Sequence, residues 1–271
     1  MFNLKGSSSL KVVKLRGTHL QECKDDVAVE RAISLYVNKK PIIVLMATPL
    51  YLEALAVGHL LSEGILKSLE EVEGLKVDKF EVYFAVKPCV EKRLNNYSSC
   101  KVKFSSSIES LKDLEPNSFK IPKVTSKVKF TVKHVFEAVE KLNEGAKLFK
   151  RTGCVHAALL MDEGFNVLCL AEDVGRHNAL DKALGMAVFR KAELDRLLLA
   201  ITGRLSMEMV IKALRFGIPA IVSISAPTKM GVNLAQKAGL TLVGFVRGDR
   251  FNVYSKSETL DLQVSSQLSR S

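Results

Sequence analysis

Apolar segments of strand length alternate regularly with segments of helical spacing between about residues 151 and 256. Strands that alternate with helices favour a largely parallel sheet covered by helices on both faces. The expected elements, in chain order, are a hairpin of strands 155–161 and 167–171 around a turn at 162–166, a helix from Asn178, a strand at 197–201, a helix at 206–216, a strand at 219–224, a helix at 228–238, and strands at 240–246 and 251–254. This pattern predicts an α/β domain over residues 131–256.

The preceding residues, 1–95, predict a smaller mixed α/β domain. Thr48 and Pro49 are expected to start a helix, as its N-cap and first helical residue, and the helix should stop near Gly64. Strands are expected at 10–15, 27–37 and 41–47, with a hairpin turn at 38–40, and two more strands between 75 and 86.

Residues 96–130 are polar and serine-rich and contain Pro116 and Pro122, a composition that predicts a flexible loop or linker. This loop carries Cys100. A helix capped by Thr131 should follow at 131–142, and the serine-rich residues 257–271 are expected to form a frayed tail.

The net charge of +11 indicates an anionic partner, which could be a nucleic acid, a phosphate-rich cofactor or an acidic protein surface. The absence of tryptophan argues against an aromatic platform for single-stranded nucleic acid. No apolar run approaches the length of about 20 residues that spans a bilayer, so no membrane partner is expected. The five cysteines are odd in number and widely spaced, as in reduced cytoplasmic proteins.

Polar residues cluster where three of the predicted strands lead into helices. The carboxyl ends of parallel strands share one edge of a sheet, where ligands bind and helix N-termini attract anions. Glycine lets a backbone approach a ligand, and arginine suits bidentate phosphate contact. The residues expected to bind an anion or nucleotide there are Asp173, Gly175, Arg176, His177, Asn178, Gly203, Arg204, Ser206, Ser225, Thr228 and Arg247. The alternative is that they are helix caps and surface arginines, with Asn178 as an N-cap.

A metal site or a hydrolase is not indicated. Cys154, His156, Cys169 and His177 match no compact zinc spacing, and the chain contains no Cys-x-x-Cys. It also lacks the Gly-x-Ser-x-Gly turn of a serine hydrolase.

Cys100 is the cysteine placed least like a core residue, because it follows two serines and precedes Lys101 and Lys103. Neighbouring lysines favour the thiolate, the nucleophilic form of cysteine. The loop therefore predicts a reactive thiol at Cys100; an incidental exposed cysteine is the alternative.

Together these motifs resemble the formate dehydrogenase accessory sulfur carriers of the FdhD family. The similarity covers about residues 25–255 and is carried by SEGI at 62–65, RTGCVHA at 151–157, EDVGRHNA at 172–179, TGRLS at 202–206, SAPT at 225–228 and GFVRGDRFNVYS at 244–255. The resemblance implies a second domain of the cytidine-deaminase-like, three-layer type without its zinc ligands. It also adds Phe245 to the candidate cofactor-binding residues.

The resemblance implies a sulfurtransferase-type carrier that receives persulfide sulfur from a cysteine desulfurase. Cys100 would bear this sulfur and pass it to the molybdenum or tungsten bis-guanine dinucleotide cofactor of formate dehydrogenase. A GDP- or GMP-like nucleotide is then a plausible ligand, and a homodimer is expected.

The chain departs from the family pattern at Lys103, which replaces the second cysteine of the family's Cys-x-x-Cys loop. Cys154 in turn stands where the family more often has glycine. One thiolate suffices to carry sulfur, but a two-cysteine relay within the loop is impossible. The departure favours a competing hypothesis, a chaperone that delivers the cofactor without sulfur transfer. A nucleic-acid-binding protein is supported by the positive charge alone.

Overall fold

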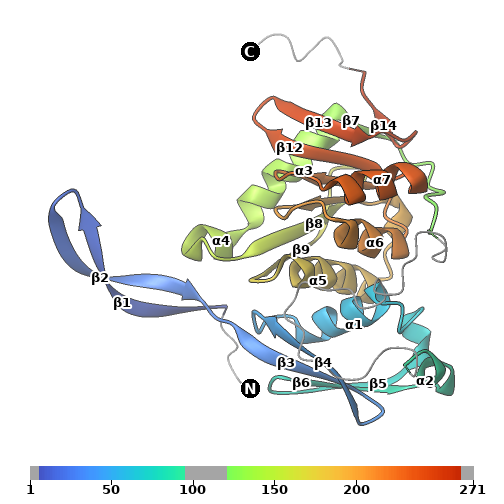
Figure 1. The fold of residues 1–271 in the computed structure, drawn as a ribbon, viewed down its shortest axis with the longest axis horizontal. Coiled ribbons are helices and arrows are strands. Elements are labelled where there is room, and N and C mark those ends of the chain that lie inside the picture. Colours follow the sequence, from blue (N-terminus) through green and yellow to red (C-terminus); the bar gives the residue numbers. More distant parts are fainter. Residues whose placement is uncertain (1–5, 95–120, 264–271) are drawn as a thin grey trace.

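A computed structural model describes residues 6–94 and 121–263. Its larger sheet has six strands in the order β13-β12-β11-β10-β8-β9 (Figure 1). β10 and β12 are parallel to β11, whereas β8 is antiparallel to β9 and β10, and β13 to β12. The expected largely parallel sheet is therefore wrong; the sheet is mixed, because hairpins form both of its edges. The strands are β8 (His156–Met161), β9 (Val167–Asp173), β10 (Leu198–Ile201), β11 (Ala220–Ser223), β12 (Thr241–Arg247) and β13 (Arg250–Ser255).

Helices cover both faces of this sheet (Figure 1). The side chains of Ala158 and Leu160 pack in one core cluster, while those of Leu159 and Met161 pack in another, as the two-residue period of a strand requires. The first core is closed by α5 (Arg176–Phe189), α6 (Met207–Arg215) and α7 (Lys229–Ala238), and the second by α3 (Val132–Gly145). The expected helices and hairpin of this region are confirmed, and the cytidine-deaminase-like assignment stays a prediction.

The second half also contains shorter elements: α4 (Lys147–Thr152), the 3-10 helix η3 (Leu194–Arg196), β7 (Phe130–Thr131) and β14 (Leu260–Asp261). The predicted cap at Thr131 is confirmed, because its hydroxyl and backbone form a capping box with His134. β14 pairs with β7, and Thr259 and Leu260 are buried. The expected frayed tail is therefore wrong for residues 257–263; residues 264–271 lie outside the described residues.

A four-stranded sheet of order β4-β3-β6-β5 forms the first half, with α1 packed on it. The turn at Asn38 and Lys39 has φ angles of 45° and 66°, which suit a two-residue hairpin, so the predicted turn is confirmed. The elements are β3 (Arg31–Val37), β4 (Lys40–Ala47), α1 (Leu52–Ser62), the 3-10 helix η1 (Leu69–Glu71), β5 (Val72–Asp78), β6 (Glu81–Val86) and α2 (Pro88–Leu94).

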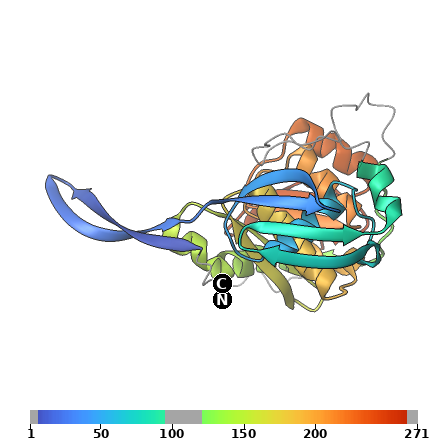
Figure 2. The same cartoon turned by 90° about the horizontal axis from the view of Figure 1, so that it is seen from below.

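Two expectations for this half are wrong. The predicted strand 27–37 is divided, and its first residues belong to a hairpin arm of β1 (Ser7–Arg16) and β2 (His19–Ala28) that projects from the body (Figures 1 and 2). Thr48 does not cap α1, which begins at Leu52 after Tyr51 in the left-handed region. Its backbone N–H donates to Asp173 and its hydroxyl accepts from the N–H of Val174, so Thr48 joins the two halves.

The two halves meet where α1 crosses α5. A Cβ atom at Gly58 would lie 1.9 Å from the carbonyl oxygen of Asp181, and one at Gly185 would lie 2.0 Å from that of Ala54. Glycine at both positions allows the two backbones to touch. Within the described residues, no helix is both long and apolar enough to cross a membrane.

Candidate functional site

The three polar junctions, the first at 172–178, the second at 202–206 and the third at 225–228, lie along one edge of the six-stranded sheet. β9 and β10 run in the same direction because both are antiparallel to β8, and β11 is parallel to β10. The second and third junctions are joined by hydrogen bonds from Leu205 N–H to Ala226 O and from Thr228 N–H to Leu205 O. This edge, with the N-termini of α5, α6 and α7, is called the rim below.

Arg176 lies across Gly203, which brings the first and second junctions together. A Cβ atom at Gly203 would lie 3.0 Å from Cβ and 3.3 Å from Cδ of Arg176, so a larger residue would displace the arginine. Burial, and then the neighbouring charge of Arg204, lower the pKa of Arg176. Arg204 itself is exposed. The Nε atom of Arg176 is buried and has no hydrogen-bond partner among the described residues.

His156, the first residue of β8, is a rim residue that was missing from the predicted site. Its Nδ1 lies 3.2 Å from the hydroxyl oxygen of Thr202, which also accepts a hydrogen bond from Ala157 N–H. Burial, and then the positive charge of Arg176, lower the pKa of His156. The imidazole is therefore neutral at pH 7 and adds a hydrogen-bonding group beside the arginines. Its sequence signal is the RTGCVHA motif, but His156 begins a strand and so does not follow from the rule that ligands bind at the carboxyl ends of strands.

His177 of the first junction and Ser206 of the second lie close to the start of α6. The Nε2 atom of His177 lies 2.9 Å from a carboxylate oxygen of Glu208, at ion-pair distance but without hydrogen-bond alignment. Ser206 occupies the N-cap position of α6, yet its hydroxyl makes no capping bond. Its Oγ atom is buried and unpartnered within the described part of the chain. A buried hydroxyl and a buried guanidinium N–H thus lack partners near the start of α6.

The third junction is only partly available to a ligand. The hydroxyl of Thr228 accepts from Gly231 N–H, so this residue caps α7 as the capping alternative anticipated. Phe245 lies next to this junction, because its N–H donates to the carbonyl of Ser225. Its φ of 54° is unusual for an aromatic residue, and its side chain is 37% exposed. The strained backbone presents an aromatic ring beside Ser225.

Asp173 and Asn178 are buried beneath the rim. One carboxylate oxygen of Asp173 accepts from Thr48 N–H and from Lys182 Nζ at 2.5 Å, and the other accepts from Gly175 N–H and the Asn178 amide. Asp173 is 0% and Asn178 1% exposed. Both residues thus hold structural contacts, and their role as ligand-binding residues stays a prediction. Asn178 is not the N-cap, a position that Gly175 occupies.

Arg247 lies on the α3 side of the sheet. It lines a hollow of 830 Å³ together with Glu140 and Phe136 of α3 and Ile224, the residue before Ser225. The hollow borders the third junction, so Arg247 approaches the rim from the opposite face to Arg176. Cys100 lies outside the described residues, and Cys154, two residues before His156, is exposed.

Comparison with known proteins identifies the chain. A model of the FdhD/NarQ family matches residues 28–261. The chain belongs to the FdhD/NarQ family. Relatives named sulfur carrier protein FdhD include one from Wolinella succinogenes, 36% identical over 90% of this chain and 86% of the relative, and one from Listeria innocua, 34% identical over 93% and 98%.

A solved structure has the same fold as this FdhD/NarQ chain. It is that of a candidate formate dehydrogenase accessory protein from Desulfotalea psychrophila, with a TM-score of 0.76 and 27% sequence identity. The match covers 94% of this chain and 100% of that protein. The mixed α/β fold is therefore shared with a formate dehydrogenase accessory protein.

Proposed function

We propose that this protein is a sulfur carrier for the maturation of formate dehydrogenase. It takes persulfide sulfur from a cysteine desulfurase and passes it to the molybdenum or tungsten bis-guanine dinucleotide cofactor, which is its cargo. The names of the relatives support the sulfur-carrying role. The odd number of cysteines suits a reducing compartment, so the proposed location is the cytoplasm.

The observation that carries the cofactor proposal is the pair of unpartnered buried atoms at the rim, Arg176 Nε and Ser206 Oγ. Buried polar groups are nearly always hydrogen-bonded, so an acceptor from outside the described chain fits here. Phosphate oxygens suit both groups, and the N-terminus of α6 adds favourable charge. The exposed ring of Phe245 offers a surface on which a guanine base can stack.

The sulfur step assigned to Cys100 is a redox-neutral exchange. The Cys100 thiolate attacks the terminal sulfur of the desulfurase persulfide, the new S–S bond forms as the old one breaks, and the desulfurase cysteine leaves as a thiolate. Cys100 then carries the terminal sulfur as its own persulfide. This role rests on the sequence setting of Cys100 and on the family membership.

Nucleotide binding tests the rim. GDP should bind the purified protein, and Arg176→Ala or Arg204→Ala should each weaken binding at least about tenfold, since a charge-assisted contact contributes about 1.5–3 kcal/mol. Arg196→Ala is the matched control, because Arg196 pairs with Glu163 away from the rim. Equal GDP affinity in all four proteins would refute the cofactor site.

Uptake of labelled sulfur from a desulfurase tests the thiol. Cys100→Ser should abolish uptake and activation of formate dehydrogenase, whereas Cys89→Ser should retain both. The competing chaperone function is favoured by Lys103 in place of the second loop cysteine. It predicts full activation by Cys100→Ser together with lost activation by Arg176→Ala, so the two functions are separable.

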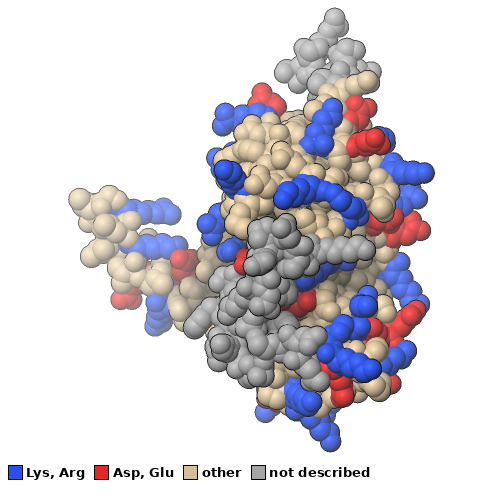
Figure 3. Space-filling view, turned by 45° about the vertical axis from the view of Figure 1, so that its right-hand side comes forward, with Lys and Arg blue, Asp and Glu red and all other residues tan. Residues whose placement is uncertain are grey.

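Nucleic-acid binding has less support. Figure 3 shows lysine and arginine side chains spread over the face it presents, with acidic side chains between them. A nucleic-acid footprint is typically a continuous basic patch or stripe.

A further inference from the structure

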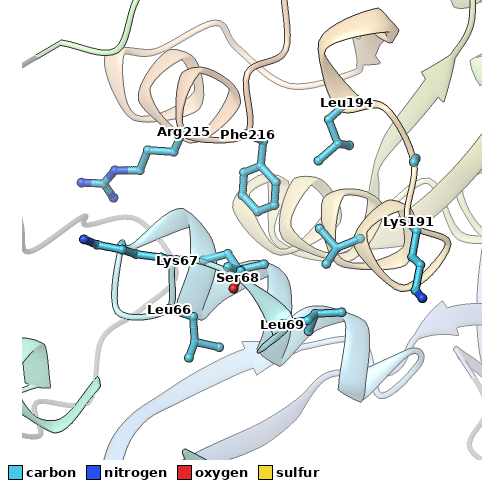
Figure 4. Close-up of a pocket in the computed structure, with 12 residues that line it drawn as sticks. Leu66, Lys67, Ser68, Leu69, Lys191, Leu194, Arg215 and Phe216 are labelled. Carbon is cyan, nitrogen blue, oxygen red and sulfur yellow. The ribbon is translucent and has the colours of Figure 1, made fainter. Parts of the chain in front are cut away.

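A second hollow lies at the opposite ends of the rim helices. It has a volume of 520 Å³ and is open to solvent. It is lined by the segment after α1, the C-terminal end of α5 with the residues that follow, and the end of α6 (Figure 4). Because the N-termini of α5 and α6 form the rim, the two sites are separated by the length of these helices. We call it the base pocket.

The base pocket has an apolar floor and a cationic margin. The floor includes Leu61, Leu66, Leu69, Val188, Leu194 and Phe216. Figure 4 shows Arg215 and Lys67 at one end and Lys191 at the other, with the ring of Phe216 between them. Among the described residues that line the pocket, these three cations are the charged ones.

Two of the acidic residues next to the base pocket are paired with other cations, and the exposed Glu70 and Asp195 do not line it. Glu71 forms an ion pair with Arg93, and Glu193 lies 3.7 Å from Arg196. Arg215 donates to the carbonyl of Ser62, which holds its chain against α1. Lys67 and Lys191 are exposed. The lining itself therefore presents positive charge over an apolar floor.

The backbone at Lys191 also indicates a role for its side chain. α5 ends at Phe189 and is capped by Arg190, so Lys191 occupies the first position beyond the cap. Its φ is 52°, in the left-handed region that glycine adopts without strain at this position. A lysine there keeps strain that glycine would relieve, and such strain is typical of functional positions.

We propose that the base pocket binds an acidic segment of a partner protein, which inserts a large apolar side chain between Lys67 and Lys191. The apolar side chain would contact the floor, and flanking carboxylates would contact the cations at both ends. Charge disfavours the arm of a second copy as occupant, because Lys14 and Arg16 flank its exposed Leu15. The proposal is independent of the rim and its cofactor.

A labelled peptide tests the proposal with the full-length protein. The probe is fluorescein-Asp-Asp-Leu-Phe-Asp-Asp-amide, and fluorescence anisotropy measures its binding. We expect saturable binding with a Kd below about 1 mM that weakens as salt is added. Lys191→Gly should weaken binding about threefold, and the double variant Lys67→Glu with Lys191→Glu at least about tenfold.

Lys237→Glu is the matched control, because Lys237 is exposed on α7 outside the base pocket. It should leave the affinity for the peptide nearly unchanged. None of these variants should change the affinity for GDP. A peptide with both apolar residues replaced by alanine should bind at least about fivefold more weakly. The proposal would be overturned if the peptide shows no saturable binding up to about 1 mM. It would also be overturned if the double variant and Lys237→Glu lose the same affinity for the peptide.

Discussion

Asp181 and Lys212 form a fully buried ion pair between α5 and α6. The Nζ atom of Lys212 lies 2.8 and 2.7 Å from the two carboxylate oxygens, and His59 Nδ1 lies 3.2 Å from one of them. Burial would raise the pKa of Asp181, but Lys212 and then His59 outweigh it and lower the pKa to about 2. The carboxylate is therefore charged in the folded protein throughout the physiological range.

Removing one partner of this pair should be costly. Lys212→Met removes the cation that the buried carboxylates of Asp181 and Glu63 share, which should lower the free energy of unfolding by about 3–5 kcal/mol. The triple variant Glu63→Gln, Asp181→Leu and Lys212→Met should recover most of that loss. Urea unfolding measures all three proteins. A loss below about 1 kcal/mol in Lys212→Met would contradict the expectation.

The same carboxylate predicts a direction for acid unfolding. Its pKa is about 2 in the folded chain and 3.8 ordinarily, so the unfolded state binds the proton more tightly. The stabilisation is fully present above the ordinary pKa and is lost as the pH falls from about 4 to about 2. In Asp181→Asn, unfolding monitored by circular dichroism should depend less steeply on pH in this window. An unchanged slope would contradict the assignment.

His156 gives a residue-scale prediction at the rim. Burial and the charge of Arg176 hold its pKa below the ordinary 6.5, so Arg176→Ala should raise it toward that value. An NMR titration of the imidazole protons measures the change. Arg196→Ala is the control, since Arg196 is not among the groups that shift His156. A lower or unchanged His156 pKa in Arg176→Ala would refute the arrangement.

At the scale of elements, the contact of α1 with α5 determines how the two halves meet. Gly58→Ala and Gly185→Ala each place a methyl group within about 2 Å of a backbone carbonyl oxygen in the facing helix. Neither backbone can withdraw easily, so each variant should be destabilised by about 1–3 kcal/mol or more. Gly74→Ala is the matched control, because its Cβ would lie 3.5 Å from Ala85, an ordinary contact. Thermal unfolding compares them; equal stability of all three would contradict this packing.

The elements also show what the sequence could and could not predict. The helices and strands after residue 151 were predicted well, because burial on one or both faces imposes a clear period. The position of the rim was predicted from the direction of the strands, since strands that run the same way end at the same edge of a sheet. Thr48 was mispredicted because its local Thr-Pro signal is that of a cap, whereas its partner Asp173 lies 125 residues away. No local pattern distinguishes a buried Asp173 or Asn178 from a ligand-binding one.

In the arm, the strand predicted at 10–15 is confirmed as part of β1, but β2 was not predicted. Leu10 and Val13 point to opposite faces of the hairpin, since residues an odd number apart alternate, and both are exposed. Without one buried face, β2 shows no two-residue period by which a sequence pattern could detect it.

At the scale of the whole molecule, the arm is where the expected homodimer can be tested. A two-stranded hairpin is marginally stable alone, and this one carries Leu15 and Leu20 with 64% and 73% exposure. If copies associate through the arm, Leu15→Lys with Leu20→Lys should halve the mass measured by light scattering and leave the melting temperature nearly unchanged. Phe189→Lys, on the body and 44% exposed, should keep the mass of the unaltered protein. The two lysines would repel their counterparts and lose the apolar contact that burial of both leucines provides. A monomeric unaltered protein would therefore refute the dimer, and an unchanged mass in the double variant would place its interface elsewhere.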